Sequence, residues 1–484
     1  MKKLWISIVF SFAVLTIAKA QLTFQKTFGG LTDDYGYSAQ QTMDGGYIIV
    51  GATIGFGAGN TDVYLIKTDS IGDTLWTKTF GKGLDDYGYS VQQTTDSGYI
   101  IAGFITSSGV GSWDFYLIRT NANGDTLWTK TYGGTGLDNV NSVKQTSDNG
   151  FIIAGTTTSF GAGSSDIYLI KTNTNGDTLW TRTFGGSSWE EGRSVQQTAD
   201  GGYIITGKTS SFGLGNDDVC LIKTNATGDT LWTKTFGGAG YENALSVQQT
   251  ADNGYIVVGA TEGFGAGNND AYLIKTDSIG NLLWSKTFGG TGNDYCTSVQ
   301  QTTDGGYIIA GTTTSFGAGS YDIYLIKTNT NGDTLWTKTF GGANDDFGQS
   351  VQQTVDGGYI IAGKTMSFGA GFNDVYLIKT DANGNSGCNQ GNTISIVTTP
   401  LTQQTIPPTI VSSPNTIVTI PATIVSNGGI VNTLCTTVGI SEITKNNLFL
   451  ISPNPSVGNF IISFERRIKK GNVEILNILG EKVF

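Results

Sequence analysis

Leu127-Trp128-Thr129-Lys130-Thr131-Tyr132-Gly133-Gly134 is the stretch that decides the fold, because copies of it recur along the chain at a fixed interval. The copies are marked by tryptophans spaced 52 residues apart, at Trp76, Trp128, Trp180, Trp232, Trp284 and Trp336. One interval before Trp76 lies Phe24, inside a matching segment, and one interval after Trp336 lies Cys388, where the match has ended. The array therefore runs from about residue 24 to 387 and holds seven units. A period of this length is typical of propellers and solenoids.

Each unit contains four short runs of β-branched and aromatic residues. In the unit that starts at Trp128, these runs are residues 127–132, 142–146, 151–157 and 166–172, separated by polar or glycine-rich loops such as 135–141. The connections are too short for parallel pairing, so the strands are expected to be antiparallel. The last run has apolar residues on both faces, which requires neighbouring sheets on both sides. Four-stranded sheets packed face to face around an axis form a β-propeller; a stacked solenoid of hairpins is the alternative.

The two ends of the array favour a closed ring. The array opens with a single strand of the tryptophan type, residues 22–28, and ends with the strand 374–380, whose expected partner is missing. If these two strands pair, seven units make seven complete blades and no open sheet edge remains at the ends of the array. The sequence thus predicts an all-β, seven-bladed β-propeller with four-stranded antiparallel blades over residues 21–387.

Residues 1–20 have the composition of a signal peptide. Two lysines precede an apolar run over residues 4–18, and Ala18-Lys19-Ala20 resembles a cleavage site, which places cleavage between Ala20 and Gln21. The run is shorter than the ~20 residues of a membrane span, although an uncleaved anchor is the alternative. No later segment is apolar over a spanning length. We therefore expect a secreted or surface-displayed protein without a transmembrane segment.

Charge and cysteine content exclude some functions. The net charge is −11, and it becomes −14 once residues 1–20 are removed, which disfavours binding to nucleic acid and leaves calcium binding open. The chain has no histidine and no cysteine pair at metal-ligand spacing, so no zinc site is expected. Cys388 and Cys435 flank a low-complexity segment and are a possible disulfide in an oxidising compartment. Cys220 replaces a tyrosine of the other six units and is interpreted as a core substitution.

The repeats resemble known propeller families. Leu169-Ile170-Lys171-Thr172-Asn173-Thr174-Asn175-Gly176-Asp177-Thr178-Leu179-Trp180 resembles the tryptophan-docking repeats of quinoprotein-type propellers. Gly185-Gly186, followed by Asp200-Gly201-Gly202-Tyr203-Ile204-Ile205-Thr206-Gly207, is more similar to the seven-bladed bacterial SBBP repeats. Both resemblances imply a propeller, and neither implies a reaction.

The C-terminal segment resembles a secretion signal. Leu448-Phe449-Leu450-Ile451-Ser452-Pro453-Asn454-Pro455, then residues 458–462 and 473–483, is similar to the type A sorting domain of the type IX secretion system. The resemblance implies a small β-sandwich over 448–484 that directs export by the type IX machinery of Bacteroidetes-type bacteria. The match stops at Phe484, where the family continues through further strands, so the copy is truncated or the sequence is incomplete. Between array and tail, residues 388–447 are rich in Thr, Ile and Pro, which predicts an extended linker in which short strands are possible.

Three acidic positions recur in every unit. The first, which follows the Gly-Gly, is the candidate ligand-binding or cation-binding rim, and its alternative role is to accept backbone N–H bonds within its own loop: Asp34, Asp86, Asp138, Glu190, Glu242, Asp294 and Asp346. The second set, Asp44 and its equivalents, precedes turn glycines and is interpreted as turn chemistry. The third, Asp62 and its equivalents, shares its strand with a repeated base at Lys67, and we expect these repeated charges to form structural ion pairs or hydrogen bonds.

A few loop aromatics break the repeat. They are candidates for stacking on sugar rings, although single exposed aromatics are common on protein surfaces: Trp113, Trp189, Tyr241, Tyr321 and Phe372. The Asn-x-Asn-Gly-Asp turns share some residues with calcium loops but lack the later bidentate glutamate, and hairpin geometry explains them.

The sequence favours a binding or adhesion scaffold for a carbohydrate or protein ligand, with no cofactor. No His-based triad, phosphate-binding loop or isolated carboxylate pair indicates catalysis. The alternatives are an extracellular glycan lyase or hydrolase and, third, a quinone-cofactor enzyme. An enzyme predicts a cluster of unlike residues at one mouth of the ring, whereas a scaffold predicts similar loops all the way round.

Overall fold

The computed structural model describes residues 20–440 except 107, 406–409, 413–416, 420–423 and 427, together with 449–452 and 461–464. Residues 1–19 of the proposed signal peptide, 1–20, lie outside this described part. Thr23–Thr436 forms one compact unit, and the short strands near the C-terminus belong to a second. All regular elements in the described ranges are strands, so these ranges contain no helix long and apolar enough to cross a membrane.

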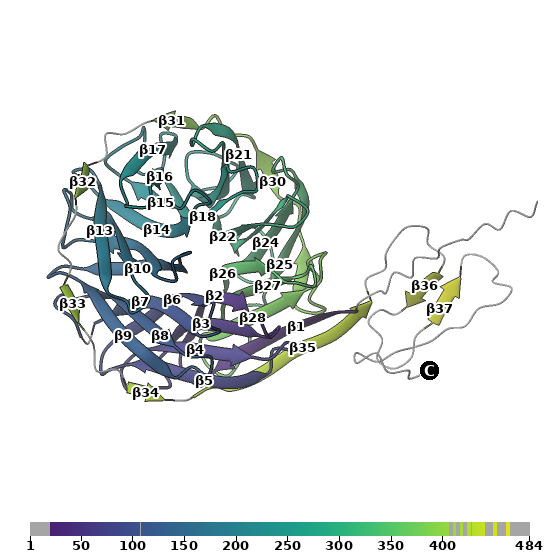
Figure 1. Ribbon diagram of the computed structural model, residues 1–484. Coiled ribbons are helices and arrows are strands. Elements are labelled where there is room, and N and C mark those ends of the chain that lie inside the picture. The colour runs from purple at the N-terminus through teal and green to yellow at the C-terminus, as the bar shows by residue number, and fades with distance from the viewer. Residues whose placement is uncertain are drawn as a thin grey trace, which may run out of the picture. The chain divides into compact units, whose positions relative to one another are not determined.

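Seven four-stranded antiparallel sheets are arranged in a ring, which confirms the predicted fold (Figure 1). Blade 1 consists, from the axis outward, of β2 (Asp34–Gln41), β3 (Tyr47–Thr53), β4 (Asp62–Thr68) and β5 (Thr74–Gly81). Blades 2 to 6 repeat this order with β6 (Asp86–Gln93), β7 (Tyr99–Ile105), β8 (Asp114–Thr120), β9 (Thr126–Gly133); β10 (Asp138–Gln145), β11 (Phe151–Thr157), β12 (Asp166–Thr172), β13 (Thr178–Gly185); β14 (Glu190–Gln197), β15 (Tyr203–Thr209), β16 (Asp218–Thr224), β17 (Thr230–Gly237); β18 (Glu242–Gln249), β19 (Tyr255–Thr261), β20 (Asp270–Thr276), β21 (Leu282–Gly289); and β22 (Asp294–Gln301), β23 (Tyr307–Thr313), β24 (Asp322–Thr328), β25 (Thr334–Phe340).

Blade 7 closes the ring with the first strand of the chain. It contains β26 (Asp346–Gln353), β27 (Tyr359–Thr365), β28 (Asp374–Thr380) and, outermost, β1 (Ala20–Gly29). The strands β1 and β28 are antiparallel, with Phe24 opposite Lys379 and Phe28 opposite Val375. The predicted pairing of the array's two ends is therefore confirmed.

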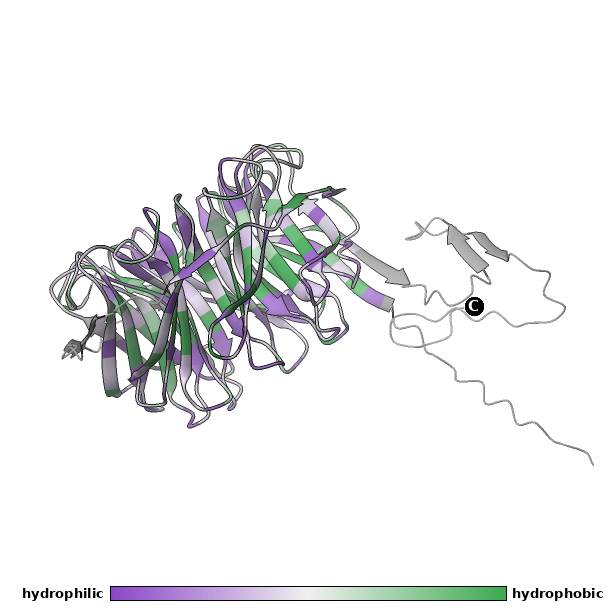
Figure 2. Ribbon diagram, turned by 90° about the horizontal axis from the view of Figure 1, so that it is seen from above, coloured by the Kyte–Doolittle hydropathy of each residue, from purple (hydrophilic) through white to green (hydrophobic). Residues whose placement is uncertain are grey.

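The core lies between the blades. The two middle strands of blade 1, β3 and β4, are buried along their whole length because each packs against sheets on both sides. Hydrophobic residues accordingly fill the middle of the strands, and hydrophilic residues gather at their ends (Figure 2). The inner strands start earlier than predicted: β10 begins at Asp138, because residues 138–140 pair with β11 before a register shift between Val140 and Ser142.

Each repeated tryptophan packs against the following blade. The Trp76 ring lies 5.9 Å from the Tyr99 ring, edge to face, and covers Gly124 in the next blade's hairpin turn. A Cβ at Gly124 would be 2.8 Å from the Trp76 ring, and the φ of this residue is +78°, so both space and backbone conformation require glycine there. This contact explains why a glycine stands four residues before each tryptophan: it belongs to a turn that receives the tryptophan of the preceding blade or, at Gly72, the equivalent Phe24.

The segment expected to be an extended linker forms a belt around the ring. We use this name for residues 390–440, whose strands add a fifth strand to every blade (Figure 1). The strands are β29 (Gln390–Asn392), β30 (Ile396–Thr398), β31 (Gln403–Thr405), β32 (Ile410–Ser412), β33 (Ile417–Thr419), β34 (Ile424–Ser426) and β35 (Ile430–Ile440). They cover blades 6, 5, 4, 3, 2, 1 and 7 in that order, so the belt runs opposite to the order of the blades. All seven outer strand edges are thereby paired, which removes edges that favour aggregation.

Hydroxyl groups fasten the belt to the propeller. The hydroxyls of Tyr324 and Tyr272, in the third strands of their blades, bond to the hydroxyls of Ser395 and Thr402. The Tyr64 hydroxyl donates to the Gly428 carbonyl at 3.1 Å. Each tyrosine ring fills the interior of the blade stack while its hydroxyl reaches the outer edge, so one residue type serves both purposes.

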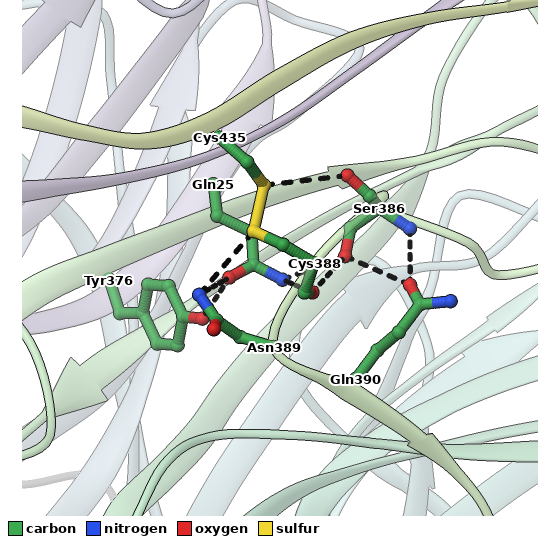
Figure 3. Close-up of a disulfide and its surroundings, with 7 residues drawn as sticks. All are labelled: Gln25, Tyr376, Ser386, Cys388, Asn389, Gln390 and Cys435. Atoms are coloured by element: carbon green, nitrogen blue, oxygen red, sulfur yellow. Dashed lines mark hydrogen bonds between the residues drawn. A yellow bond between two sulfur atoms is a disulfide. The ribbon is translucent and has the colours of Figure 1, made fainter. Parts of the chain in front are cut away.

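A disulfide joins the segment just before the belt to the belt's last strand. Cys388 follows the last blade, Cys435 lies in β35, and their Cα atoms are 6.4 Å apart (Figure 3). Gln25 donates to the Ser386 hydroxyl at 2.7 Å, which ties the first strand to the same place. The remaining cysteines, Cys220 and Cys296, are free and buried, and burial raises the pKa of both thiols.

The second unit contributes one described hairpin. Its strands β36 (Phe449–Ser452) and β37 (Ile461–Phe464) pair antiparallel, with Ile451 opposite Ile462. The other residues of the expected sorting domain, 448–484, lie outside the described ranges, so its β-sandwich fold stays a prediction.

Candidate functional site

The ring has two chemically different ends. At the hairpin end, each blade makes two tight turns, which in blade 1 are residues 42–46 and 69–73. At the loop end, where the inner strands begin, lie the longer connections, which in blade 1 are residues 54–61 and 82–85. Repeated acids occur at both ends, and the aromatic residues that differ from blade to blade lie at the second.

The hairpin end is nearly identical in all blades. In each, the base on the third strand pairs with the second-set aspartate: Lys67 Nζ lies 2.9 Å from Asp44 Oδ2, and the equivalents are Arg119–Asp96, Lys171–Asp148, Lys223–Asp200, Lys275–Asp252, Lys327–Asp304 and Lys379–Asp356. Burial alone would raise the pKa of Asp200, but hydrogen bonds from Thr198, Lys223 and Gly202 outweigh it and lower the pKa to about 2. The bases are buried while most of the aspartates remain exposed, so these are structural ion pairs.

The third set of acids does not supply the partner of these bases. Asp62 instead accepts the N–H groups of Ala58 and Gly59 through Oδ2, at 3.0 and 2.9 Å. Burial raises its pKa against those hydrogen bonds. The expected ion pairs therefore exist, but between the base and the turn aspartate, because the base and Asp62 lie at opposite ends of the same strand.

The seven first-set acids, predicted as a ligand-binding rim, are all buried at the start of the inner strands. One carboxylate oxygen of each accepts the backbone N–H four residues earlier at 2.8–2.9 Å: Gly30 to Asp34, Lys82 to Asp86, Gly134 to Asp138, Gly186 to Glu190, Gly238 to Glu242, Gly290 to Asp294 and Gly342 to Asp346. Burial raises the pKa of Asp34 to about 6, opposed by bonds from Thr53 and Gly30. This is the geometry of the alternative role, in which each acid holds its own loop together.

The loop end carries two runs of aromatic contacts, one over blades 6 and 7 and one over blades 1 and 2, which Lys364 joins and which together we call the aromatic arc. Its members are Tyr321, Phe347, Tyr35, Tyr37, Tyr89, Tyr87, Phe104 and Trp113. The rings of Tyr87, Phe104 and Trp113 are stacked, with centroid distances of 5.0 and 4.8 Å. Lys364 bridges blades 7 and 1, its Nζ lying 4.6 Å from the Phe347 ring centroid and 5.1 Å from that of Tyr35.

Partial burial shifts the pKa values of two side chains in and beside the arc. Burial, and then the Asp33 charge, raise the pKa of Tyr35 to about 12. Burial lowers the pKa of Lys364, opposed by Asp33 and Asp345. At neutral pH the tyrosine is thus a neutral hydrogen-bonding group, and the lysine Nζ lies among aromatic faces.

Blade 4 contributes a charged cluster at the same end: Glu191, Arg193, Lys208 and Asp217. The Arg193 guanidinium pairs with Glu191, and Lys208 Nζ lies 3.0 Å from Asp217 and 3.7 Å from Glu191. Trp189 donates its indole N–H to Glu191 at 2.9 Å. Blades 3 and 5 have Asn139 and Asn243 at the position that Glu191 occupies.

The five loop aromatics predicted as sugar contacts do not form one site. Trp113 and Tyr321 belong to the aromatic arc, and Trp189 borders the charged cluster; Tyr241 and Phe372 are exposed, and neither has an aromatic contact in the described ranges. The residues missed from sequence, such as Tyr35 and Glu191, lie on the early part of the inner strands. In the sequence that part appeared as polar loop, but the position that Tyr35 and Glu191 share varies among the seven units, and this signal was available.

The calcium-like turns have the geometry of hairpins. Asn173 Oδ1 accepts the N–H groups of Asn175 and Asp177, at 2.9 Å each, and its amide donates to Asp177. The oxygens that a cation would need are thus engaged within the turn. Among the described residues, no three His, Cys, Asp or Glu side chains are grouped to hold a metal.

Comparisons with known proteins support the fold. A family model described as a domain of unknown function (DUF5122) beta-propeller matches residues 302–334. The regulatory protein FlaEY of Caulobacter vibrioides is 26% identical over 198 residues, which is 35% of this chain. The match spans only 20% of that relative's length.

Several solved structures are similar at low identity. One is a protein of unknown function from Bacteroides caccae, with a TM-score of 0.36, 11% identity and coverage of 65% of this chain and 93% of that chain. Another is Drosophila Plexin A in complex with Semaphorin 1b, with a TM-score of 0.41, 9% identity and coverage of 75% and 88%. Scores this low carry no functional argument, since one fold hosts many functions.

Proposed function

We propose that this protein is an extracellular binding scaffold whose loop end holds a glycan along the aromatic arc. The observation that carries the proposal is the contrast between the two ends. A residue kept in all seven units serves the unit itself, whereas residues that differ from blade to blade serve something without sevenfold symmetry. The aromatic residues that differ between blades gather at the loop end.

The side chains of the arc suit a carbohydrate ligand. Partly exposed rings present flat apolar faces to the C–H faces of sugars, and tyrosine hydroxyls and the Lys364 ammonium can bond to sugar hydroxyls. Trp113, with 38% of its surface exposed, ends the stack at the surface of the ring. The arc spans four blades, so we expect an oligosaccharide rather than a single sugar.

We also propose export by the type IX machinery to the cell surface or the medium. The signal-like residues 1–20, the sorting motif in 448–484 and the Cys388–Cys435 disulfide support this, because disulfides persist in oxidising compartments. Retention of the protein inside cells that lack the type IX machinery is the expected result. Unchanged release from those cells would refute this route.

The test of the ligand is a glycan array probed with the mature chain, with and without calcium, followed by calorimetry on the best glycan. Replacing Trp113 by alanine should weaken binding about tenfold or more, as for an aromatic anchor. Met43→Ala is the matched control, because Met43 is exposed at the hairpin end and should leave affinity unchanged. A folded mature chain that binds no glycan, or equal losses in both variants, would refute the glycan site.

One observation favours an enzyme as the second candidate. Unlike residues do cluster at one end, and Glu191 and Asp217 both contact Lys208, which places two carboxylates close together. Paired carboxylates are the machinery of glycoside hydrolysis. Under this alternative, the mature chain hydrolyses a polysaccharide. Glu191→Gln should then abolish hydrolysis, whereas Trp113→Ala should weaken binding. Recovery of the bound glycan intact after prolonged incubation would exclude the enzyme.

A further inference from the structure

Glutamines link the inner strands near the hairpin end. At six junctions between neighbouring blades, a glutamine Oε1 accepts the backbone N–H of a glutamine in the next blade, at 2.5–2.7 Å: Gln40 to Gln93, Gln92 to Gln145, Gln196 to Gln249, Gln248 to Gln301, Gln300 to Gln353 and Gln352 to Gln41. Each bond satisfies a donor on the open inner edge of a sheet.

The junction between blades 3 and 4 departs from this pattern. Lys144 occupies the position of the linking glutamine, and Gln197 is the residue whose N–H would be accepted. A lysine ammonium offers three donors and no acceptor. This junction therefore lacks the side-chain acceptor that the other six junctions have, and carries a donor in its place.

Lys144 also lacks a counter-charge. Within the described residues its ammonium has no hydrogen bond and no ion pair, whereas Lys171, on the same blade, is paired with Asp148. Burial lowers the pKa of Lys144, although part of the side chain reaches solvent. A half-buried cation beside an unmatched N–H needs an acceptor from outside the chain.

We propose that this junction binds a small oxyanion, such as sulfate, phosphate or a carboxylate, between the Lys144 ammonium and the Gln197 N–H. An anion supplies the missing acceptor and the missing counter-charge together, through short charge-assisted hydrogen bonds. The Oε1 atoms of Gln92 and Gln196, on the neighbouring blades, are engaged with Gln145 and Gln249 and do not supply the missing acceptor. The site is near the hairpin end, so it is distinct from the aromatic arc.

The test is a titration of the mature chain with sodium sulfate by calorimetry, at constant ionic strength adjusted with sodium chloride. The matched variant is Lys144→Gln, which installs the residue of the other six junctions and supplies an Oε1 to Gln197. We expect saturable binding to the unaltered chain and at least tenfold weaker binding to the variant. Gln248→Lys recreates the arrangement between blades 5 and 6 and should add a second site.

A second measurement needs no variant. Reductive methylation followed by mass spectrometry should show Lys144 modified more slowly in saturating sulfate than in chloride, with the exposed Lys82 unaffected. Absence of a saturable heat, equal affinity of the unaltered chain and Lys144→Gln, or equal methylation in both salts would show that water alone serves these donors. Each of those results would overturn the proposal.

Discussion

The disulfide between the segment just before the belt and the belt's last strand should contribute strongly to stability. We consider the double substitution Cys388→Ser and Cys435→Ser, which keeps the size of both side chains. The two cysteines are 47 residues apart in sequence, and in the chain-entropy model a cross-link over this separation stabilises the folded state by about 4 kcal/mol. The physical reason is that the open chain gains freedom chiefly in the unfolded state.

The assay is guanidinium unfolding of the oxidised chain, the reduced chain and the double variant. We expect the oxidised chain to unfold at a clearly higher guanidinium concentration than the other two. Reductant should leave the double variant unchanged, because Cys220 and Cys296 are free and buried. Limited proteolysis should cut the belt first in both forms without the bond. The reasoning that the disulfide holds the belt would be refuted if the unfolding free energies of the oxidised chain and the double variant differed by less than about 1 kcal/mol, a quarter of the chain-entropy figure.

Three further perturbations test the packing, the charges and the exceptional junction. Trp180→Ala should cost about 3–5 kcal/mol because it empties an interblade contact, whereas Trp113→Ala at the exposed loop end should cost far less, both measured by urea unfolding. Burial raises the pKa values of Asp34 and Asp322 to about 6. The folded protein therefore binds these two protons more tightly than the unfolded chain does, and the resulting stabilisation is fully present below pH 3.8 and is lost as the pH rises through 6. Replacing either aspartate with asparagine should flatten that part of a plot of unfolding free energy against pH. Lys144→Gln should raise the unfolding free energy by about 1 kcal/mol in anion-free buffer, since it restores a buried hydrogen bond. A lower unfolding free energy in the variant would count against the inference that Gln197 lacks an acceptor.

The belt shows what a reading of the sequence could have recovered. Its strands β30 to β34 begin seven residues apart, and Pro400, Pro407, Pro414 and Pro421 share that spacing. An extended chain covers about 3.3 Å per residue, so seven residues span roughly 23 Å, enough to step from one outer edge to the next. The composition alone indicated a linker, because β-branched residues between prolines are typical both of extended linkers and of edge strands.

The residues of the loop end were missed for a different reason. Tyr35, Tyr87 and Glu191 were assigned to polar loops, because the first half of each inner strand lacks a continuous apolar run. In the ring this half faces the axis on the innermost strand, where polar and aromatic side chains replace aliphatic ones. Strand propensity therefore gave no signal, whereas comparison of the units position by position would have identified them.

The sequence by itself determined the number of blades and the closure by the first strand, because an unbroken period repeats the same strand pattern in every unit. Only the tertiary structure decided that the C-terminal segment encircles the ring and that the first-set acids are buried. It alone brought Tyr321, Phe347 and Tyr35 from opposite ends of the array to one surface. Ring closure makes neighbours of residues more than 280 positions apart, and the period of the repeat does not specify contacts between side chains that differ from unit to unit.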